Sequence, residues 1–145
     1  FDEVHPISEL KGVLPRANVM VIALPLTKYT RRLIGEAELS LLPDDAIVVN
    51  VARGDVVKED ELYRVLTRRR GLRFGTDVFW DYGSGESLTP RTGLLNLPNF
   101  IGTPHIAGGA QPDVARNAII MAVNNLIRYL KGEGALNEVN RSDYV

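Results

Sequence analysis

Four strand-like segments recur at a constant step of 27 residues, and this recurrence constrains the fold more than any other feature of the sequence. The segments begin at Val19, Ala46, Arg73 and Phe100. A step of this length holds one strand, one crossover helix and two loops, so it predicts a parallel β-sheet with right-handed crossovers. The units share no residue-level similarity, which indicates a regular α/β fold and not a duplicated motif.

Apolar patterning and the positions of proline and glycine predict the individual elements. Strands are expected over residues 19–24, 46–51, 73–79 and 99–103, and helices over residues 8–14, 30–42, 59–70 and from 112 onward. The segment 46–51 is β-branched and almost uncharged, which is typical of a strand buried on both faces of a parallel sheet. Residues 81–98 contain three glycines and two prolines, so they predict a long irregular loop of the kind that is often functional.

Composition narrows the classes of partner. A chain of 145 residues with a net charge of -1 is one domain with no electrostatic preference for nucleic acid or for anionic membranes. The only basic run, residues 68–70, ends a predicted helix, where it complements the helix dipole. Cysteine is absent, which excludes disulfides and thiolate chemistry. No apolar run approaches the length of about 18 residues that a membrane span needs. We therefore expect a soluble, cytoplasmic protein.

The carboxyl ends of the predicted strands carry the residues with chemical potential. Pro25, Arg53, Asp77 and His105 each follow a strand, and ligands bind at this edge of open α/β sheets. The planar fork of an arginine suits a carboxylate or a phosphate. Two glycines at positions 108 and 109 would let the backbone after His105 approach a ligand closely. The alternatives are a solvated surface arginine and a histidine that caps or fills the core.

Four motifs, in order along the chain, resemble the D-isomer-specific 2-hydroxyacid dehydrogenases, a family that includes phosphoglycerate, glyoxylate/hydroxypyruvate and D-lactate dehydrogenases. The motifs are Leu24–Thr27, Val49–Gly54, Thr76–Phe79 and Leu97–His105. The resemblance implies a Rossmann-like fold: the second half of a doubly wound dinucleotide-binding domain, with a long C-terminal helix. It divides the chain into a partial NAD-binding domain, residues 1–110, and a helix and tail, residues 111–145, that return to a substrate domain absent from this sequence.

The resemblance also implies roles for single residues. Arg53 would bind the carboxylate and oxo group of a 2-oxo acid, and His105 would be the general acid in reduction and the base in oxidation. Asp77 would fix the nicotinamide carboxamide. The remaining cofactor contacts would come from Leu24, Pro25, Thr30, Val51, Ala52, Arg53, His105 and Gly108. The implied cofactor is NAD, with NADP as the alternative. The implied substrate is a small 2-oxo acid, the implied assembly is a homodimer, and no metal is expected.

One departure from the family concerns the partner of His105. The family places a glutamate five residues after the aspartate, where it pairs with the histidine and keeps it protonated, but this chain has Tyr82 at that position. A neutral phenol cannot supply the charge of a carboxylate. Either Glu86 or Asp81 replaces the glutamate, or the pairing is absent. We favour Glu86 as the third catalytic residue, because glycines on both sides of position 84 would let the loop fold back.

A second departure leads to a prediction about cofactor binding. The Gly-x-Gly-x-x-Gly fingerprint is missing, and Gly83-Ser84-Gly85 does not replace it, because it lacks the third glycine and Pro90 stands where a helix should begin. These 145 residues alone are therefore expected to bind NAD weakly. Isothermal titration calorimetry checks this expectation, and a micromolar dissociation constant would contradict it.

Two other functions fit the sequence. The same fold could serve as a non-catalytic NAD-sensing scaffold similar to a corepressor, which the tyrosine at position 82 favours and the pair of Arg53 and His105 disfavours. The other alternative is an unrelated flavodoxin-like binding module. The residues that select the substrate side chain, and those that choose between NAD and NADP, are expected to lie outside this sequence.

Overall fold

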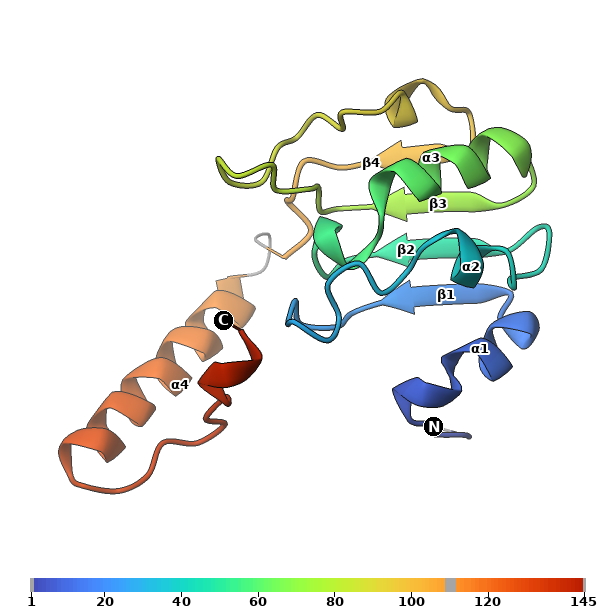
Figure 1. The fold of residues 1–145 in the computed structure, drawn as a ribbon. Coiled ribbons are helices and arrows are strands. Elements are labelled where there is room, and N and C mark those ends of the chain that lie inside the picture. Colours follow the sequence, from blue (N-terminus) through green and yellow to red (C-terminus); the bar gives the residue numbers. More distant parts are fainter. Residues whose placement is uncertain (1, 109–111, 145) are drawn as a thin grey trace. The chain divides into compact units, whose positions relative to one another are not determined.

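A computed structural model describes residues 2–108 and 112–144 of the chain (Figure 1). The chain divides into two compact units, Phe1–His105 and Ile106–Val145.

The first unit is built on a four-stranded parallel sheet in the order β1-β2-β3-β4. The strands are β1 (Val19–Ile22), β2 (Ile47–Asn50), β3 (Arg73–Thr76) and β4 (Phe100–Gly102). Their pairing confirms the parallel sheet that the 27-residue step predicts. Each strand ends earlier than predicted, because the chain turns away at the carboxyl edge, where the candidate site residues lie.

Short helices accompany the sheet. They are α1 (Leu10–Val13), which lies between two 3-10 turns, α2 (Glu36–Leu39) and α3 (Glu59–Arg68). Helix α3 has three acidic residues in its first turn and a basic residue in its last, an arrangement that complements the helix dipole. It buries Leu62, Val65 and Leu66, as its apolar spacing predicts. Arg69 follows α3 and donates to the carbonyl oxygens of Leu39 and Leu42, both at 2.7 Å, so it stabilises the end of α2.

The helix predicted over residues 30–42 is wrong for its first half. Ile34 pairs with residues 56–58 as an isolated β-bridge: Ile34 N donates to Val56 O at 3.0 Å, and Lys58 N donates to Ile34 O at 2.8 Å. Arg32 has a positive φ of 57°, which no helix allows. Ile34 is buried through this extended pairing, so its apolar character does not require a helix.

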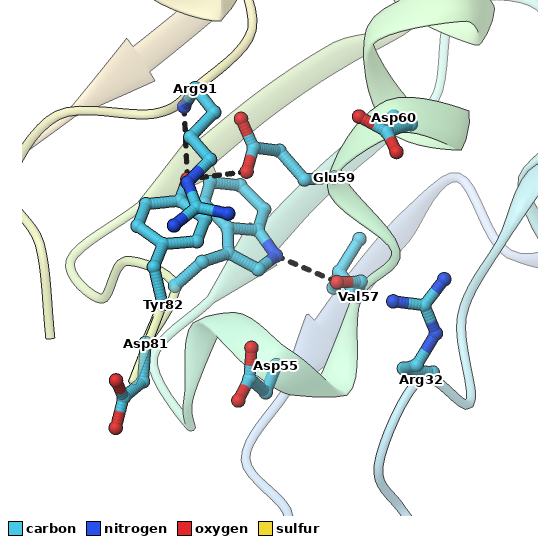
Figure 2. Close-up of a pocket in the computed structure, with 9 residues that line it drawn as sticks. Arg32, Asp55, Val57, Glu59, Asp60, Asp81, Tyr82 and Arg91 are labelled. Carbon is cyan, nitrogen blue, oxygen red and sulfur yellow. Dashed lines mark hydrogen bonds between the residues drawn. The ribbon is translucent and has the colours of Figure 1, made fainter. Parts of the chain in front are cut away.

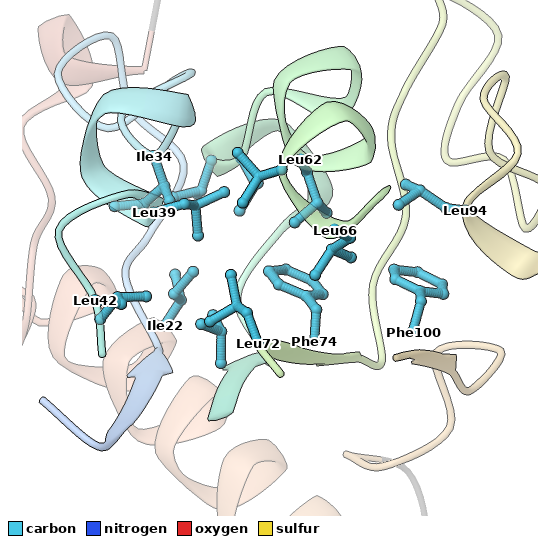
Figure 3. Packing of buried hydrophobic residues seen from close by; sticks show 14 of the residues in the cluster. Ile22, Ile34, Leu39, Leu42, Leu62, Leu66, Leu72, Phe74, Leu94 and Phe100 are labelled. Carbon is cyan, nitrogen blue, oxygen red and sulfur yellow. The ribbon is translucent and has the colours of Figure 1, made fainter. Parts of the chain in front are cut away.

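The core fills the space between one face of the sheet and helices α2 and α3 (Figure 3). Phe74 and Phe100 stand on neighbouring strands with parallel rings whose centroids are 5.9 Å apart. On the other face of the sheet the exposed apolar side chains are Val19, Val21, Ile47 and Ile101. The expectation that residues 46–51 are buried on both faces is therefore wrong for the described chain, since α2 and α3 cover one face only (Figure 1).

Residues 81–98 form the predicted irregular loop, whose only helical turn is a 3-10 turn at Leu94–Asn96. Two glycines of this loop, Gly83 and Gly85, have φ values of +95° and +94°. This left-handed conformation favours glycine, so the local path of the loop depends on these two residues.

The second unit consists of α4 (Pro112–Leu130) and a tail that folds back on it. Asn125 Nδ2 donates to Leu136 O at 3.0 Å, and its Oδ1 accepts from Leu136 N at 2.9 Å. The predicted helix is confirmed, but its apolar side chains, such as Ile119 and Leu126, are exposed. Among the described residues, no helix is both long enough and apolar enough to cross a bilayer.

Candidate active site

Arg53 is presented by a tight turn directly after β2. The buried Asn50 holds this turn: its Nδ2 donates to Arg53 O and its Oδ1 accepts from Ala52 N, both at 3.0 Å. Gly54 packs against the backbone of the segment after β3, where an added Cβ would lie 2.1 Å from Phe79 O. Asn50 and Gly54 therefore fix the position from which the Arg53 side chain extends.

Replacing Asn50 by alanine is expected to destabilise the protein by about 2–4 kcal/mol, because it leaves two backbone groups of the turn without partners. Urea denaturation measures the loss. Asn96→Ala is the matched control, since Asn96 is exposed, and it should change the free energy of unfolding by less than about 0.5 kcal/mol. Equal losses in the two variants would contradict the role given to Asn50.

Asp77 and Thr103 meet at the carboxyl ends of β3 and β4. Asp77 is 7% exposed, and Thr103 Oγ1 donates to its Oδ1 at 2.5 Å. A carboxylate has lone pairs for several donors, so Asp77 can accept a carboxamide N–H in addition to the threonine hydroxyl. This chemistry fits the role that the family resemblance implies for Asp77.

His105 contacts Glu86 from the long loop. Glu86 Oε2 lies 2.6 Å from His105 Nδ1, and Glu86 Oε1 accepts from Phe79 N, also at 2.6 Å. Of the two carboxylates considered for this contact, Asp81 is engaged elsewhere: its Oδ1 accepts from Gly83 N at 2.7 Å and from Gly85 N at 3.0 Å. The structure therefore brings Glu86, and not the Asp81 carboxylate, to His105.

Arg53 and Glu86 line one cavity of about 240 Å³ at this edge of the sheet. The lining residues are Leu26, Arg31, Arg53, Gly54, Asp55, Phe79, Asp81 and Glu86. Arg31 Nη1 donates to Asp55 Oδ2 at 2.8 Å, so this second guanidinium is paired. The cavity can hold a small anion beside Arg53, with the Glu86–His105 pair next to it.

Tyr82 lies near Glu59 at the start of α3, beside a second cavity of about 210 Å³ (Figure 2). Its hydroxyl donates to Glu59 Oε2 and accepts from Arg91 N at 2.9 Å. Burial, together with the hydrogen bond to Glu59, raises the pKa of the Tyr82 phenol to about 12. The phenol is therefore a neutral donor at physiological pH, and it binds a carboxylate other than the one that pairs with the histidine.

Some of the predicted cofactor contacts lie along the same carboxyl edge of the sheet. Thr30 Oγ1 donates to Pro25 O at 2.6 Å and accepts from Thr27 N at 2.8 Å, so this hydroxyl shapes the loop after β1. Leu24 and Val51 are exposed, whereas the side chain of Ala52 is buried. Gly108 belongs to the second unit, and position 109 lies outside the described residues.

Sequence reasoning missed three residues that shape the site. Asn50 is hidden at the end of an apolar strand, where its amide is the only polar side chain of that run. Glu59 is one of three consecutive acidic residues that begin the helix, a pattern that indicates only a favourable helix dipole, but it is buried and receives three hydrogen bonds. The sequence does not single out Asp55, because its pairing with Arg31 depends on the non-helical path of residues 31–34.

Comparison with known proteins identifies the relatives of the chain. A protein-family model described as "D-isomer specific 2-hydroxyacid dehydrogenase, NAD binding domain" matches residues 2–107. The chain is 38% identical over 132 residues to glyoxylate/hydroxypyruvate reductase B of Pectobacterium carotovorum. This match covers 91% of the chain and 40% of that protein. The chain is 36% identical over 132 residues to the protein of that name from Salmonella paratyphi B, with coverage of 91% and 39%.

Solved structures give the same result. A D-isomer specific 2-hydroxyacid dehydrogenase from Xanthobacter autotrophicus Py2, in complex with NADPH, matches 94% of this chain and 54% of its own with 35% identity and a TM-score of 0.79. An NADPH-dependent glyoxylate/hydroxypyruvate reductase from Sinorhizobium meliloti has a TM-score of 0.78 at 23% identity, with coverage of 97% and 44%, and shows the shared fold. The chain spans about two fifths of the length of the curated relatives it matches.

Proposed function

Because the chain belongs to the D-isomer specific 2-hydroxyacid dehydrogenase family, we propose that the protein transfers a hydride between NAD(P)H and a small 2-oxo acid, and so forms a D-2-hydroxy acid. One observation carries the proposal: Arg53 and Glu86 line the same cavity, and Glu86 contacts His105. An anion-binding fork and an acid–base group are thus adjacent, as reduction of a keto acid requires. Glyoxylate and hydroxypyruvate are the first substrates to test, because relatives carry those names.

Each proposed catalytic residue has a separate task. The guanidinium of Arg53 binds the substrate carboxylate through parallel hydrogen bonds and polarises the neighbouring carbonyl. His105 donates a proton to the carbonyl oxygen as negative charge develops there, and in the reverse direction it accepts the hydroxyl proton. Glu86 holds the imidazole of His105 through its contact with Nδ1. The nicotinamide cofactor supplies or accepts the hydride.

The cofactor would be held along the carboxyl edge of the sheet. Asp77 would accept from the carboxamide, and the backbone after β1 and β2, at Leu24, Pro25, Val51 and Ala52, would line the remaining surface. The hydroxyl of Thr30 supports the loop at Pro25, so its contribution would be indirect. The family resemblance further supports residues 1–110 as a partial cofactor-binding domain, and Gly108 lies near the end of that range. It also supports a homodimer that works in the cytoplasm.

Replacing Glu86 by glutamine is expected to lower kcat for reduction about tenfold. The amide keeps the size of the side chain but loses the charged acceptor that contacts His105 Nδ1, so the imidazole is held less firmly. The rate of NADH oxidation at saturating keto acid checks the result. Glu133→Gln, an exposed change on the other unit, is the control. An unchanged kcat in Glu86→Gln would show that Glu86 is not the partner of the acid–base group.

Steady-state NADH oxidation by the full-length protein separates the enzyme from the NAD-sensing scaffold. With glyoxylate or hydroxypyruvate, a reductase consumes NADH in proportion to the substrate added, and the rate saturates with its concentration. A scaffold binds NADH, which calorimetry detects, but leaves it unconsumed. Cofactor binding without turnover on either keto acid or on a wider set of 2-oxo acids would overturn the proposed activity.

A further inference from the structure

The residue at the position of the missing family glutamate anchors the loop that supplies the replacement carboxylate. Glu86 stands within the glycine-containing loop 81–93, and its two oxygens must reach Phe79 N and His105 Nδ1 together. A loop with two glycines in the left-handed conformation has many alternative paths. Something must therefore hold it in the one path that places Glu86 on the histidine.

Glu59, at the start of α3, holds both ends of this loop. Its Oε2 accepts from the hydroxyl of Tyr82 at one end. Its Oε1 accepts from N and Oγ1 of Thr92 at the other end, both at 2.8 Å. Glu59 is only 9% exposed, so these hydrogen bonds form away from bulk water, where they contribute more than they would on an open surface.

Arg91 joins the two ends of the loop directly. Its backbone N donates to the Tyr82 hydroxyl at 2.9 Å, and its guanidinium lies 3.8 Å from the centroid of the Tyr82 ring (Figure 2). The ring is thus covered on one face by a cation, which adds a stabilising cation–π contact. Tyr82 is the one side chain in this group that contacts both the helix and the far end of the loop.

The middle of the loop is fixed separately, close to Glu86. Asp81 forms an antiparallel bridge with Glu86, and Ser87 N donates to Trp80 O at 3.0 Å. This short hairpin determines the direction in which Glu86 extends. The hydrogen bonds of Tyr82 and Thr92 to Glu59 connect the loop to α3.

We propose that Tyr82 and Glu59 are positioning residues that hold loop 81–93 against α3, so that Glu86 remains on His105 during the reaction. This proposal rests on the proposed function in one respect: the Glu86–His105 contact affects turnover only if the protein is a reductase. Position 82, where the family pattern places the glutamate, then anchors the loop, and the carboxylate comes from position 86, four residues further along the chain.

Tyr82→Phe tests the proposal, because it retains the ring and its contact with Arg91 but removes the hydroxyl. The change removes two hydrogen bonds, one to the Glu59 carboxylate and one from Arg91 N. Loss of the bond to the carboxylate alone shifts a docked–undocked equilibrium about tenfold. We expect kcat for reduction to fall by up to about that factor. The KM for the keto acid should change less than about twofold, because Arg53 is held by a different element. The matched control is Tyr29→Phe, since Tyr29 is 69% exposed and its ring contact with Lys28 survives the change.

A spectroscopic readout separates failure of this proposal from failure of the proposed function. In ¹⁵N-histidine-labelled protein, the Nδ1-bound proton of His105 reports its hydrogen bond to a carboxylate, and His105→Asn assigns the signal. We expect Tyr82→Phe to weaken or shift this signal while the signal of His5 stays unchanged. The His105 signal can be measured even if the protein has no reductase activity. Absence of turnover alone would therefore count against the proposed function and not against the positioning role of Tyr82.

A double-mutant cycle completes the test. Glu59→Gln removes the charge at the other end of the same hydrogen bond, so Tyr82→Phe combined with Glu59→Gln should lower kcat no further than the more severe single variant. Additive losses would show that the two residues act independently and would overturn the proposal. So would a Tyr82→Phe protein that loses thermal stability but keeps both its kcat and its His105 signal, because the role of Tyr82 would then be structural only.

Discussion

Replacing His105 by asparagine is expected to lower kcat for 2-oxo acid reduction by a factor of about 10²–10⁴, the usual contribution of a general acid. Without the imidazole, the developing alkoxide must take its proton from water. Asparagine is the suitable replacement because His105 has a positive φ of 52°, a conformation that asparagine tolerates better than most residues. The measurement is the steady-state rate of NADH oxidation at saturating keto acid.

The control for this variant is the same substitution at the only other histidine of the chain. His5 is far from His105 in the sequence, lies at the surface and pairs with Glu3 and Glu9. The variant His5→Asn should therefore retain kcat within about twofold. The affinity of His105→Asn for NADH, measured by calorimetry, should stay close to that of the unmodified protein. A fall in kcat of less than about fivefold would remove His105 from the role of proton donor.

The sheet could be predicted from sequence because its signals are local. Each strand is a short apolar run, and the helix over residues 59–70 buries the face that its own periodicity defines. The first half of the segment 30–42 could not be predicted in this way, since Leu33 and Ile34 satisfy a helical pattern equally well. Their extended conformation depends on backbone hydrogen bonds to residues 55–58, which are more than twenty positions away.

The site shows the same division. Arg53, Asp77 and His105 could be placed at one edge because the carboxyl ends of parallel strands meet there. The choice between Glu86 and Asp81 could not be made from sequence, because both carboxylates stand in the same glycine-containing loop and either could reach the histidine. What distinguishes them is the turn at Gly83 and Gly85, which takes the Asp81 carboxylate and leaves Glu86 directed at the histidine.

Replacing Arg53 by glutamine is expected to lower kcat/KM for the keto acid by a factor of about 10²–10⁴. Each hydrogen bond to a charged group contributes about 1.5–3 kcal/mol, two are lost with the guanidinium fork, and about 1.4 kcal/mol corresponds to a factor of ten. Arg53→Lys keeps the charge but not the fork, so its kcat/KM should lie between those of the glutamine variant and the unmodified protein. Steady-state kinetics with varied keto acid give all three values.

The matched control for Arg53 lies at the opposite edge of the same sheet. Arg73 is the first residue of β3, so it stands at the amino edge, whereas Arg53 follows β2 at the carboxyl edge. Arg73→Gln removes the same charge from the unit but should change kcat/KM less than about twofold. Equal losses in the two variants would mean that the overall charge of the unit attracts the substrate. A loss confined to Arg53→Gln and graded through Arg53→Lys would mean that the bidentate geometry at the carboxyl edge is what binds it.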